Sequence, residues 1–284
     1  MSLAAVAETP VEAGVQSPGY LVETRQPVYS AALVLPFLLA YEIGIFLIRS
    51  DEINGGDAIL LNLGGPILRW LGLGYGSASL LALGAFFVGA QYYKKGSWKI
   101  RFSFFLTALF ESLLYAVILF LILGYLVQYL PRTHAAPAAR APAAESRNPR
   151  VRQAESATDA TLVPAAKAKQ NQFRPKLRDF VLYCGAGVYE ELVFRVILLG
   201  LLMLVCTKLF HMEHAYAAVW AVILGAFIFS AFHHIGGEPF SIGPFIQRVF
   251  AGLYFSAIYF NRCFGIAAAS HALYDVLVGL NAFV

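Results

Sequence analysis

Long runs of apolar residues alternate with short polar stretches along most of the chain. Seven runs approach the length of a bilayer-spanning helix, which needs about 20 mostly apolar residues. They lie at about residues 28–48, 77–92, 102–130, 180–206, 215–232, 244–260 and 266–283. A weakly amphipathic stretch at 58–75 is expected to form a surface helix, or an eighth span if it inserts. The pattern predicts an all-α fold, a polytopic transmembrane helical bundle of about seven to eight spans.

The polar stretches divide the chain into four parts. Residues 1–27 lack the features of a cleaved signal peptide and are predicted to form a flexible N-terminal tail. Residues 28–130 hold the N-terminal transmembrane helices. Residues 131–176 are rich in Ala, Pro, Arg and Lys without any apolar period, which is typical of a disordered linker. Residues 177–284 hold the C-terminal transmembrane helices.

The composition supports a membrane protein and excludes several other classes. Hydrophobic residues make up 59% of the chain and charged residues only 13%, which is too apolar for a soluble domain of this size. We therefore expect an integral, multi-pass membrane protein, in the cell membrane if the host is bacterial. The net charge is only +4 and the basic residues gather in loops, so nucleic-acid binding is not expected. The three cysteines are isolated and form neither a disulfide framework nor a CxxC metal site.

Three charged residues interrupt the apolar run at 180–206, namely Glu190, Glu191 and Arg195. Each charge at the centre of a bilayer costs about 2.5 to 3.5 kcal/mol on insertion scales. Glu191 and Arg195 are four residues apart on one helical face and can pair. Glu190 points about 100° away around the helix axis and is left unpaired, which suits a general base. The alternative is a buried salt-bridge cluster that only fixes helix packing.

Two later spans carry further polar residues at helical spacing. Phe229 and His233 are four residues apart near the end of one span, and His271 and Asp275 are four apart in another. Taken singly, His233 could merely cap a helix end, and His271 could form an ordinary intrahelical bond with Asp275. Ionisable groups inside three separate spans together indicate a functional site.

The three motifs, in this order on successive apolar segments, resemble those of the CPBP family of intramembrane endopeptidases. They are EExxxR from Glu190 to Arg195, FxxxH from Phe229 to His233, and HxxxN/D from His271 to Asp275. That family groups the Ras-converting CAAX proteases with bacterial abortive-infection and bacteriocin-processing or immunity proteins. The resemblance covers about residues 178–284, and residues 1–130 resemble no named family.

The resemblance implies a glutamate-dependent peptidase acting within the membrane. Glu190 and His233 would hold and deprotonate the attacking water, His271 and the residue at 275 would line the oxyanion pocket, and Arg195 would orient the carboxylates. The resulting set of predicted catalytic residues is Glu190, Glu191, Arg195, His233, His271 and Asp275, with Phe229 as a substrate contact. The partners implied are the lipid bilayer and a membrane-associated protein or peptide substrate.

Position 275 departs from the CAAX proteases, which carry Asn where this chain has Asp275. An ionised carboxylate accepts hydrogen bonds but cannot donate one. Asp275 is therefore expected either to be protonated in its apolar site or to fix the tautomer of His271. His234 is a second open point, since it could replace its neighbour His233 if the helix ends early.

Two alternatives to a cofactor-free peptidase are kept. Glu190, His233 and His271 are acceptable zinc ligands, and three protein ligands plus a water make a catalytic zinc site, although no HExxH helix preorganises one. A non-catalytic scaffold or immunity protein could bind a peptide in the same cavity, because fold alone does not define function. A transporter is disfavoured because no inverted repeat is evident.

Overall fold

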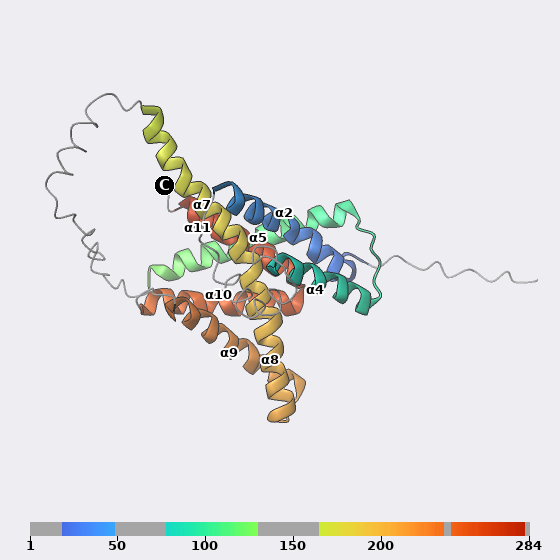
Figure 1. Ribbon diagram of the computed structural model, residues 1–284. Helices are drawn as coiled ribbons and strands as arrows, with labels where there is room; N and C mark the ends of the chain where they lie inside the picture. The colour runs from blue at the N-terminus through green and yellow to red at the C-terminus, as the bar shows by residue number, and fades with distance from the viewer. Residues whose placement is uncertain (1–18, 49–77, 130–164, 236–239, 282–284) are drawn as a thin grey trace, which may run out of the picture.

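The computed structural model describes residues 19–48, 78–129, 165–235 and 240–281, and these residues form helices without any strand (Figure 1). The helices that precede the long central rod are α1 (Tyr20–Glu23), α2 (Pro27–Ile48), α4 (Ala78–Lys94) and α5 (Phe102–Val127). The rod consists of α7 (Ala165–Glu191), η2 (Leu192–Leu198), α8 (Leu199–Leu204) and η3 (Val205–Leu209). The helices that follow it are α9 (His214–Ile235), α10 (Ile242–Asn261) and α11 (Phe264–Asn281).

Each of the seven predicted apolar runs forms a helix. Four helices are long and apolar enough to cross a membrane, at Pro27–Leu47, Phe102–Val127, Leu177–Leu209 and His214–Ile235, and Phe264–Leu280 is a shorter apolar helix. The protein is thus an integral, multi-pass membrane protein built as a helical bundle. Among the described residues, four helices meet the length and hydropathy required for a span, whereas seven to eight spans were predicted. The number is lower because α4 has only 17 residues and α10 is more polar than the other long helices.

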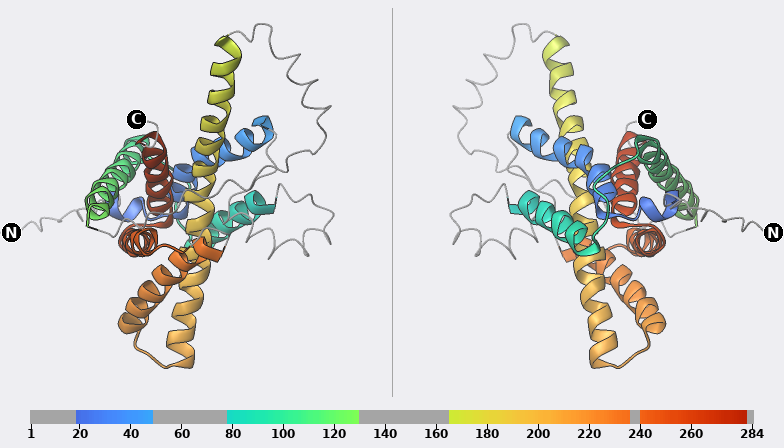
Figure 2. Two further views of the ribbon diagram at one scale, coloured as in Figure 1. Left: turned by 90° about the vertical axis from the view of Figure 1, so that its left-hand side faces the viewer. Right: turned by 90° about the vertical axis from the view of Figure 1, so that its right-hand side faces the viewer.

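The rod from α7 to η3 crosses the whole molecule, and α9 runs back beside α8 (Figure 2). Two of its segments, η2 and η3, are π-helical. η2 starts directly after the Glu190-Glu191 pair and contains Arg195. Such widened turns are rare and occur frequently at functional sites.

α11 lies at the centre of the bundle, packed against α7, α5, α2 and α10. It is buried on all sides near its start, where Ala267, Ala268 and Ala269 are fully buried. α7 approaches α11 so closely that a Cβ built on Gly187 would lie 2.3 Å from the backbone nitrogen of Ala272. Small residues allow this kind of backbone approach between membrane helices. The contact sets the distance between the Glu-Glu pair on α7 and His271, the residue before Ala272 on α11.

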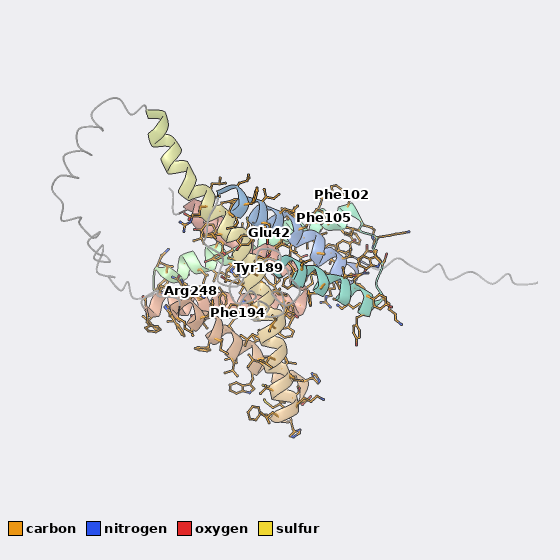
Figure 3. All side chains as sticks on the ribbon, viewed as in Figure 1. Glu42, Phe102, Phe105, Tyr189, Phe194 and Arg248 are labelled. Atoms are coloured by element: carbon orange, nitrogen blue, oxygen red, sulfur yellow. The ribbon has the colours of Figure 1, made fainter. Side chains whose placement is uncertain are left out.

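Large apolar side chains cover the outer faces of the bundle (Figure 3). Phe46 on α2, Phe102 and Phe110 on α5, and Leu209 at the end of the rod are each at least 67% exposed. In a soluble protein a surface of this kind would mark an interface. In this bundle it is the surface that faces lipid.

Two described helices begin inside segments that were predicted to be flexible or disordered. α1 lies inside the predicted flexible tail, where Glu23 and Thr24 are buried and Glu23 bonds with Tyr29 (2.6 Å) and Arg101. α7 begins at Ala165, inside the predicted linker, because the stretch from 165 to 170 is rich in Ala, Lys and Gln, which favour helix without any apolar period. The predicted surface helix at 58–75 and residues 130–164 of the linker lie outside the described residues.

Candidate active site

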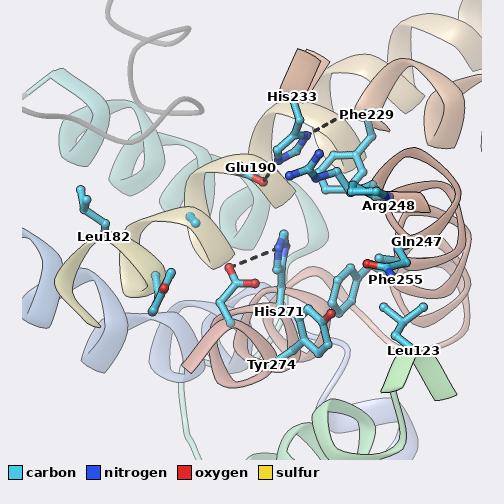
Figure 4. Close-up of a pocket in the computed structure, with 15 residues that line it drawn as sticks. Leu123, Leu182, Glu190, Phe229, His233, Gln247, Arg248, Phe255, His271 and Tyr274 are labelled. Atoms are coloured by element: carbon cyan, nitrogen blue, oxygen red, sulfur yellow. Dashed lines mark hydrogen bonds and ion pairs between the residues drawn. The ribbon is translucent and has the colours of Figure 1, made fainter. Parts of the chain in front are cut away.

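A cavity of about 440 Å³ opens between α7, α9, α10 and α11 (Figure 4). Five of the predicted site residues line it, namely Glu190, Phe229, His233, His271 and Asp275. The other two, Glu191 and Arg195, are 0% and 1% exposed and lie behind its wall. The fold therefore brings residues from three motifs, up to 85 positions apart in the sequence, to one place.

Glu190 and His233 face each other across part of this cavity. Oε2 of Glu190 lies 3.7 Å from Nε2 of His233, and Glu190 is 7% exposed. Nδ1 of His233 is 2.9 Å from the carbonyl oxygen of Phe229, which can only accept a hydrogen bond. Nδ1 therefore carries the proton, and a neutral His233 presents its Nε2 lone pair towards Glu190. α9 continues to Ile235, so His233 lies within the helix, and its hydrogen bond to the carbonyl one turn earlier fixes the orientation of the ring.

Glu191 links two helices from the buried side of the cavity. Its Oε2 forms an ion pair with Nε of Arg195 at 3.0 Å, and its Oε1 accepts a hydrogen bond from Nδ1 of His271 at 2.8 Å. The four-residue spacing of Glu191 and Arg195 predicted the first contact. The second, between α7 and α11, was not predicted and follows from the close packing at Gly187.

The tautomer of His271 is thus set by Glu191, which holds the proton on Nδ1. Its other nitrogen, Nε2, lies 3.5 Å from Oδ2 of Asp275, one helical turn further along α11. This distance exceeds that of an ordinary hydrogen bond. Asp275 has a side chain that is 20% exposed, and it faces the cavity beside Nε2 of His271.

Two phenyl rings hold the buried cation and the imidazole in place. The guanidinium carbon of Arg195 lies 4.7 Å from the ring centre of Phe229 and 5.7 Å from that of Phe255. Phe255 also stacks on His271 with ring centres 4.5 Å apart and an angle of 19° between the planes. Phe229 is only 3% exposed, so most of its surface supports Arg195 and His233, although its edge reaches the cavity.

Several cavity residues were missed by the sequence reasoning. α10 contributes Gln247 and Arg248, and α7 and α11 contribute Tyr183 and Tyr274. Figure 4 shows Arg248 beside His233 and Phe229. The available signal was the pair Gln247-Arg248 inside an otherwise apolar run, since polar residues in such runs usually face a functional cavity.

His234 occupies a different environment from His233. Its ring lies 5.2 Å from Phe240 and stacks on Phe245 at 5.9 Å, and it does not line the cavity. Within the described part of the chain, no group of three or more His, Cys, Asp or Glu side chains is arranged to hold a metal ion.

The site is thus a cluster of carboxylates and imidazoles that lies inside a helical membrane bundle. Residues 175–277, which include all three motifs, match the family model of type II CAAX prenyl endopeptidase Rce1-like proteins. This match supports the resemblance of this part of the chain to the CPBP family of intramembrane CAAX-type proteases. No curated protein and no solved structure matches the chain.

Proposed function

We propose that this protein is an intramembrane endopeptidase that hydrolyses a peptide bond of a membrane-associated protein or peptide with a water activated by Glu190 and His233. The observation that carries the proposal is the 3.7 Å separation between Glu190 Oε2 and His233 Nε2 at the wall of the cavity. This gap is too long for a direct hydrogen bond. It fits two acceptors that share one bound water.

The proposed first step is attack of this water on the carbonyl carbon of the substrate peptide. Glu190 removes a proton from the water as the new C–O bond forms, and His233 holds the second hydrogen and orients the lone pair. The carbonyl π electrons move to oxygen and give a tetrahedral oxyanion. The proton on Glu190 then passes to the leaving amine as the C–N bond breaks, which restores the carboxylate.

The oxyanion is assigned to the side of the cavity that holds His271 and Asp275. With Nδ1 donating to Glu191, a doubly protonated His271 can donate Nε2–H to the oxyanion. A protonated Asp275 would be a second donor, and an ionised Asp275 would instead stabilise the charge on His271. A fixed donor in a dry cavity is worth about 3 to 4 kcal/mol to a tetrahedral intermediate.

Glu191 and Arg195 are proposed as positioning residues that do not touch the substrate. Arg195 neutralises Glu191, and Glu191 orients His271, so the pair holds the imidazole on α11 in a fixed position relative to α7. The proposal requires no metal ion for proton removal, and a zinc-bound water on the same residues is the alternative.

The test is hydrolysis by the purified protein in lipid nanodiscs. Internally quenched peptides ending in a CAAX sequence, with and without a prenyl group on the cysteine, would report cleavage and the need for lipid in the substrate. Glu190→Gln should fold and purify as the wild type does and lose at least about 100-fold in kcat, as expected on removal of a general base. His234→Gln, a neighbouring change outside the cavity, is the control and should retain activity.

Near-wild-type turnover by the Glu190→Gln variant would overturn the mechanism. If the wild type cleaves no peptide of this panel, comparison of membrane proteomes with and without the Glu190→Ala variant would seek new protein termini. An absence of any difference there would favour the non-catalytic scaffold.

A further inference from the structure

A second cavity, of about 460 Å³, lies where α2 begins, α4 ends, and the α10–α11 turn meets them. It shares no lining residue with the catalytic cavity. Its described lining residues are Arg25, Pro27, Ser30, Phe86, Phe87, Ala90, Lys94, Tyr259, Phe260, Arg262, Cys263 and Phe264. We call it the α4 groove.

The α4 groove carries an excess of positive charge. Three cations line it, Arg25, Lys94 and Arg262, and none of its described lining residues is acidic. Of these three cations, Arg262 alone has a carboxylate partner among the residues that the structure describes: Glu111 accepts from its Nε at 2.5 Å and from its Nη2 at 2.8 Å. Arg25 donates to the backbone oxygen of Asn261, which leaves its charge uncompensated. A ligand with at least one negative charge would therefore complete the groove.

Arg262 gives a second, independent sign of a missing partner. It is 8% exposed, and its Nη1 is buried without a hydrogen-bond acceptor among the described residues. Buried donors of this kind are normally satisfied, because an unmade hydrogen bond costs about 1–3 kcal/mol.

The remainder of the α4 groove is apolar. Phe86 and Phe87 from α4 pack edge to face against Phe264 of α11 at 6.2 and 5.7 Å, and all three rings line the groove. Ala90 leaves space on the α4 side, and Phe260, 44% exposed, stands at the rim. A purely hydrophilic anion would leave these walls without a partner.

The position of the α4 groove matches the polar boundary of a bilayer. The candidate spans of α2 and α5 begin at Pro27 and Phe102, and Arg25 lies two residues before the first of them. The loop after Lys94 adds Lys95 and Lys99 at the same end of the helices. Basic residues at this level attract anionic lipid headgroups, with about 1 kcal/mol for each Lys or Arg.

We propose that the α4 groove binds one anionic membrane phospholipid, with its phosphate held by Arg25, Lys94 and Nη1 of Arg262, and an acyl chain along Phe86, Ala90 and Phe260. A phospholipid is the one abundant membrane component that supplies both the negative charge and the apolar chain that the groove lacks. The bound lipid would connect α2 and α4 in the N-terminal half with α10 and α11, which carry site residues. This site is independent of the peptidase proposal, because it requires no chemistry in the first cavity.

The test is intact-protein mass spectrometry of the full-length protein released from nanodiscs that contain equal amounts of phosphatidylglycerol and phosphatidylcholine. The wild type should retain one phosphatidylglycerol in preference to phosphatidylcholine. Arg25→Gln/Lys94→Gln should lower this retention about 30-fold, which is about 5-fold for each charge removed. Lys208→Gln removes an exposed cation at the end of the rod, outside the groove, and is the matched control that should leave retention unchanged.

A second pair of variants tests the acyl chain without altering charge. Ala90→Trp should fill the apolar part and abolish retention, whereas Ala85→Trp, on an exposed position of the same helix, should not. Inorganic phosphate at millimolar concentration should fail to displace the lipid, since a free anion gains nothing from the phenyl walls. Equal retention of the two lipids by the wild type, or unchanged retention by both groove variants, would overturn the proposal.

Discussion

Replacing Arg195 with Met tests how much stability the protein loses when Glu191, behind the catalytic cavity, is left buried without its cation. The change removes the cation from an ion pair in which Arg195 and Glu191 are 1% and 0% exposed. Removal of one partner from a buried pair costs about 3–5 kcal/mol, because the other charge stays buried alone. At about 2–4 °C for each kcal/mol, the melting temperature should fall by roughly 6–20 °C.

The double variant Arg195→Met/Glu191→Leu separates charge balance from positioning. A buried pair replaced by apolar residues is often neutral in stability or better. The double variant still loses the 2.8 Å hydrogen bond from His271 to Glu191, and bonds to charged groups are worth about 1.5–3 kcal/mol. Its stability should therefore lie between that of the wild type and that of Arg195→Met.

Activity should follow a different order from stability. Both variants should lose peptide hydrolysis, because Arg195→Met leaves the carboxylate of Glu191 without its cation, and the double variant also removes the hydrogen bond that orients His271. Thermal unfolding followed by intrinsic fluorescence and hydrolysis of a quenched peptide, on the same preparations, would give the two orders. A double variant that is less stable than Arg195→Met, or one that regains activity, would contradict the positioning role of Glu191 and Arg195.

Further predictions concern the oxyanion side, the metal alternative, helix packing and the N-terminal helix. Asp275→Asn should retain or raise hydrolysis if position 275 donates to the oxyanion, whereas a loss above about 10-fold would indicate that an ionised Asp275 stabilises the imidazolium. Exhaustive treatment with a membrane-permeant chelator should leave activity intact, and loss that is reversed specifically by zinc would replace the general-base mechanism by a metal-bound water. Gly187→Ala should cost about 1–3 kcal/mol and impair hydrolysis, because its Cβ would meet backbone of α11 at 2.3 Å, while Gly200→Ala, with no atom within 4 Å of its Cβ, should be tolerated in a thermal melt. The hydrogen bond from Arg101 holds the pKa of Glu23 below its ordinary value, so the attachment of α1 is at full strength when the pH is above that ordinary value and is lost as the pH falls through the lowered pKa. Limited proteolysis before Pro27 should therefore increase at acidic pH. Equal cleavage at acidic and neutral pH would contradict this account.

The apolar pattern predicted the helices, and the three motifs predicted five of the fifteen residues that line the cavity. Both signals are local: a run of about 20 apolar residues defines a span, and a four-residue spacing places Glu191 beside Arg195. For the same reason the family resemblance could be carried residue by residue to Glu190, His233 and His271. All three were found at one cavity.

The interactions between helices were not predictable from these signals. The bond from His271 to Glu191 joins positions 80 residues apart and depends on how closely α7 approaches α11 at Gly187. Arg248 belongs to none of the motifs, so its place in the cavity depends on the rotation of α10. α1 looked like a polar tail because the partners of Glu23, such as Tyr29 and Arg101, lie in the helices that follow.

The π-helical segment η2 (Leu192–Leu198) also determines which way the side chains of α8 and η3 point around the axis of the rod. Its hydrogen bonds run from residue i to i+5, so it accommodates one more residue per turn than the α-helix on either side. In an uninterrupted α-helix, that residue would turn α8 by about 100°. The face of α8 that meets α9, where Leu199 approaches Gly225, is therefore in register only because the extra residue is present. A chain shortened by one residue within η2 would keep both glutamates on α7 yet turn the packing face of α8 away from α9, the helix that carries His233.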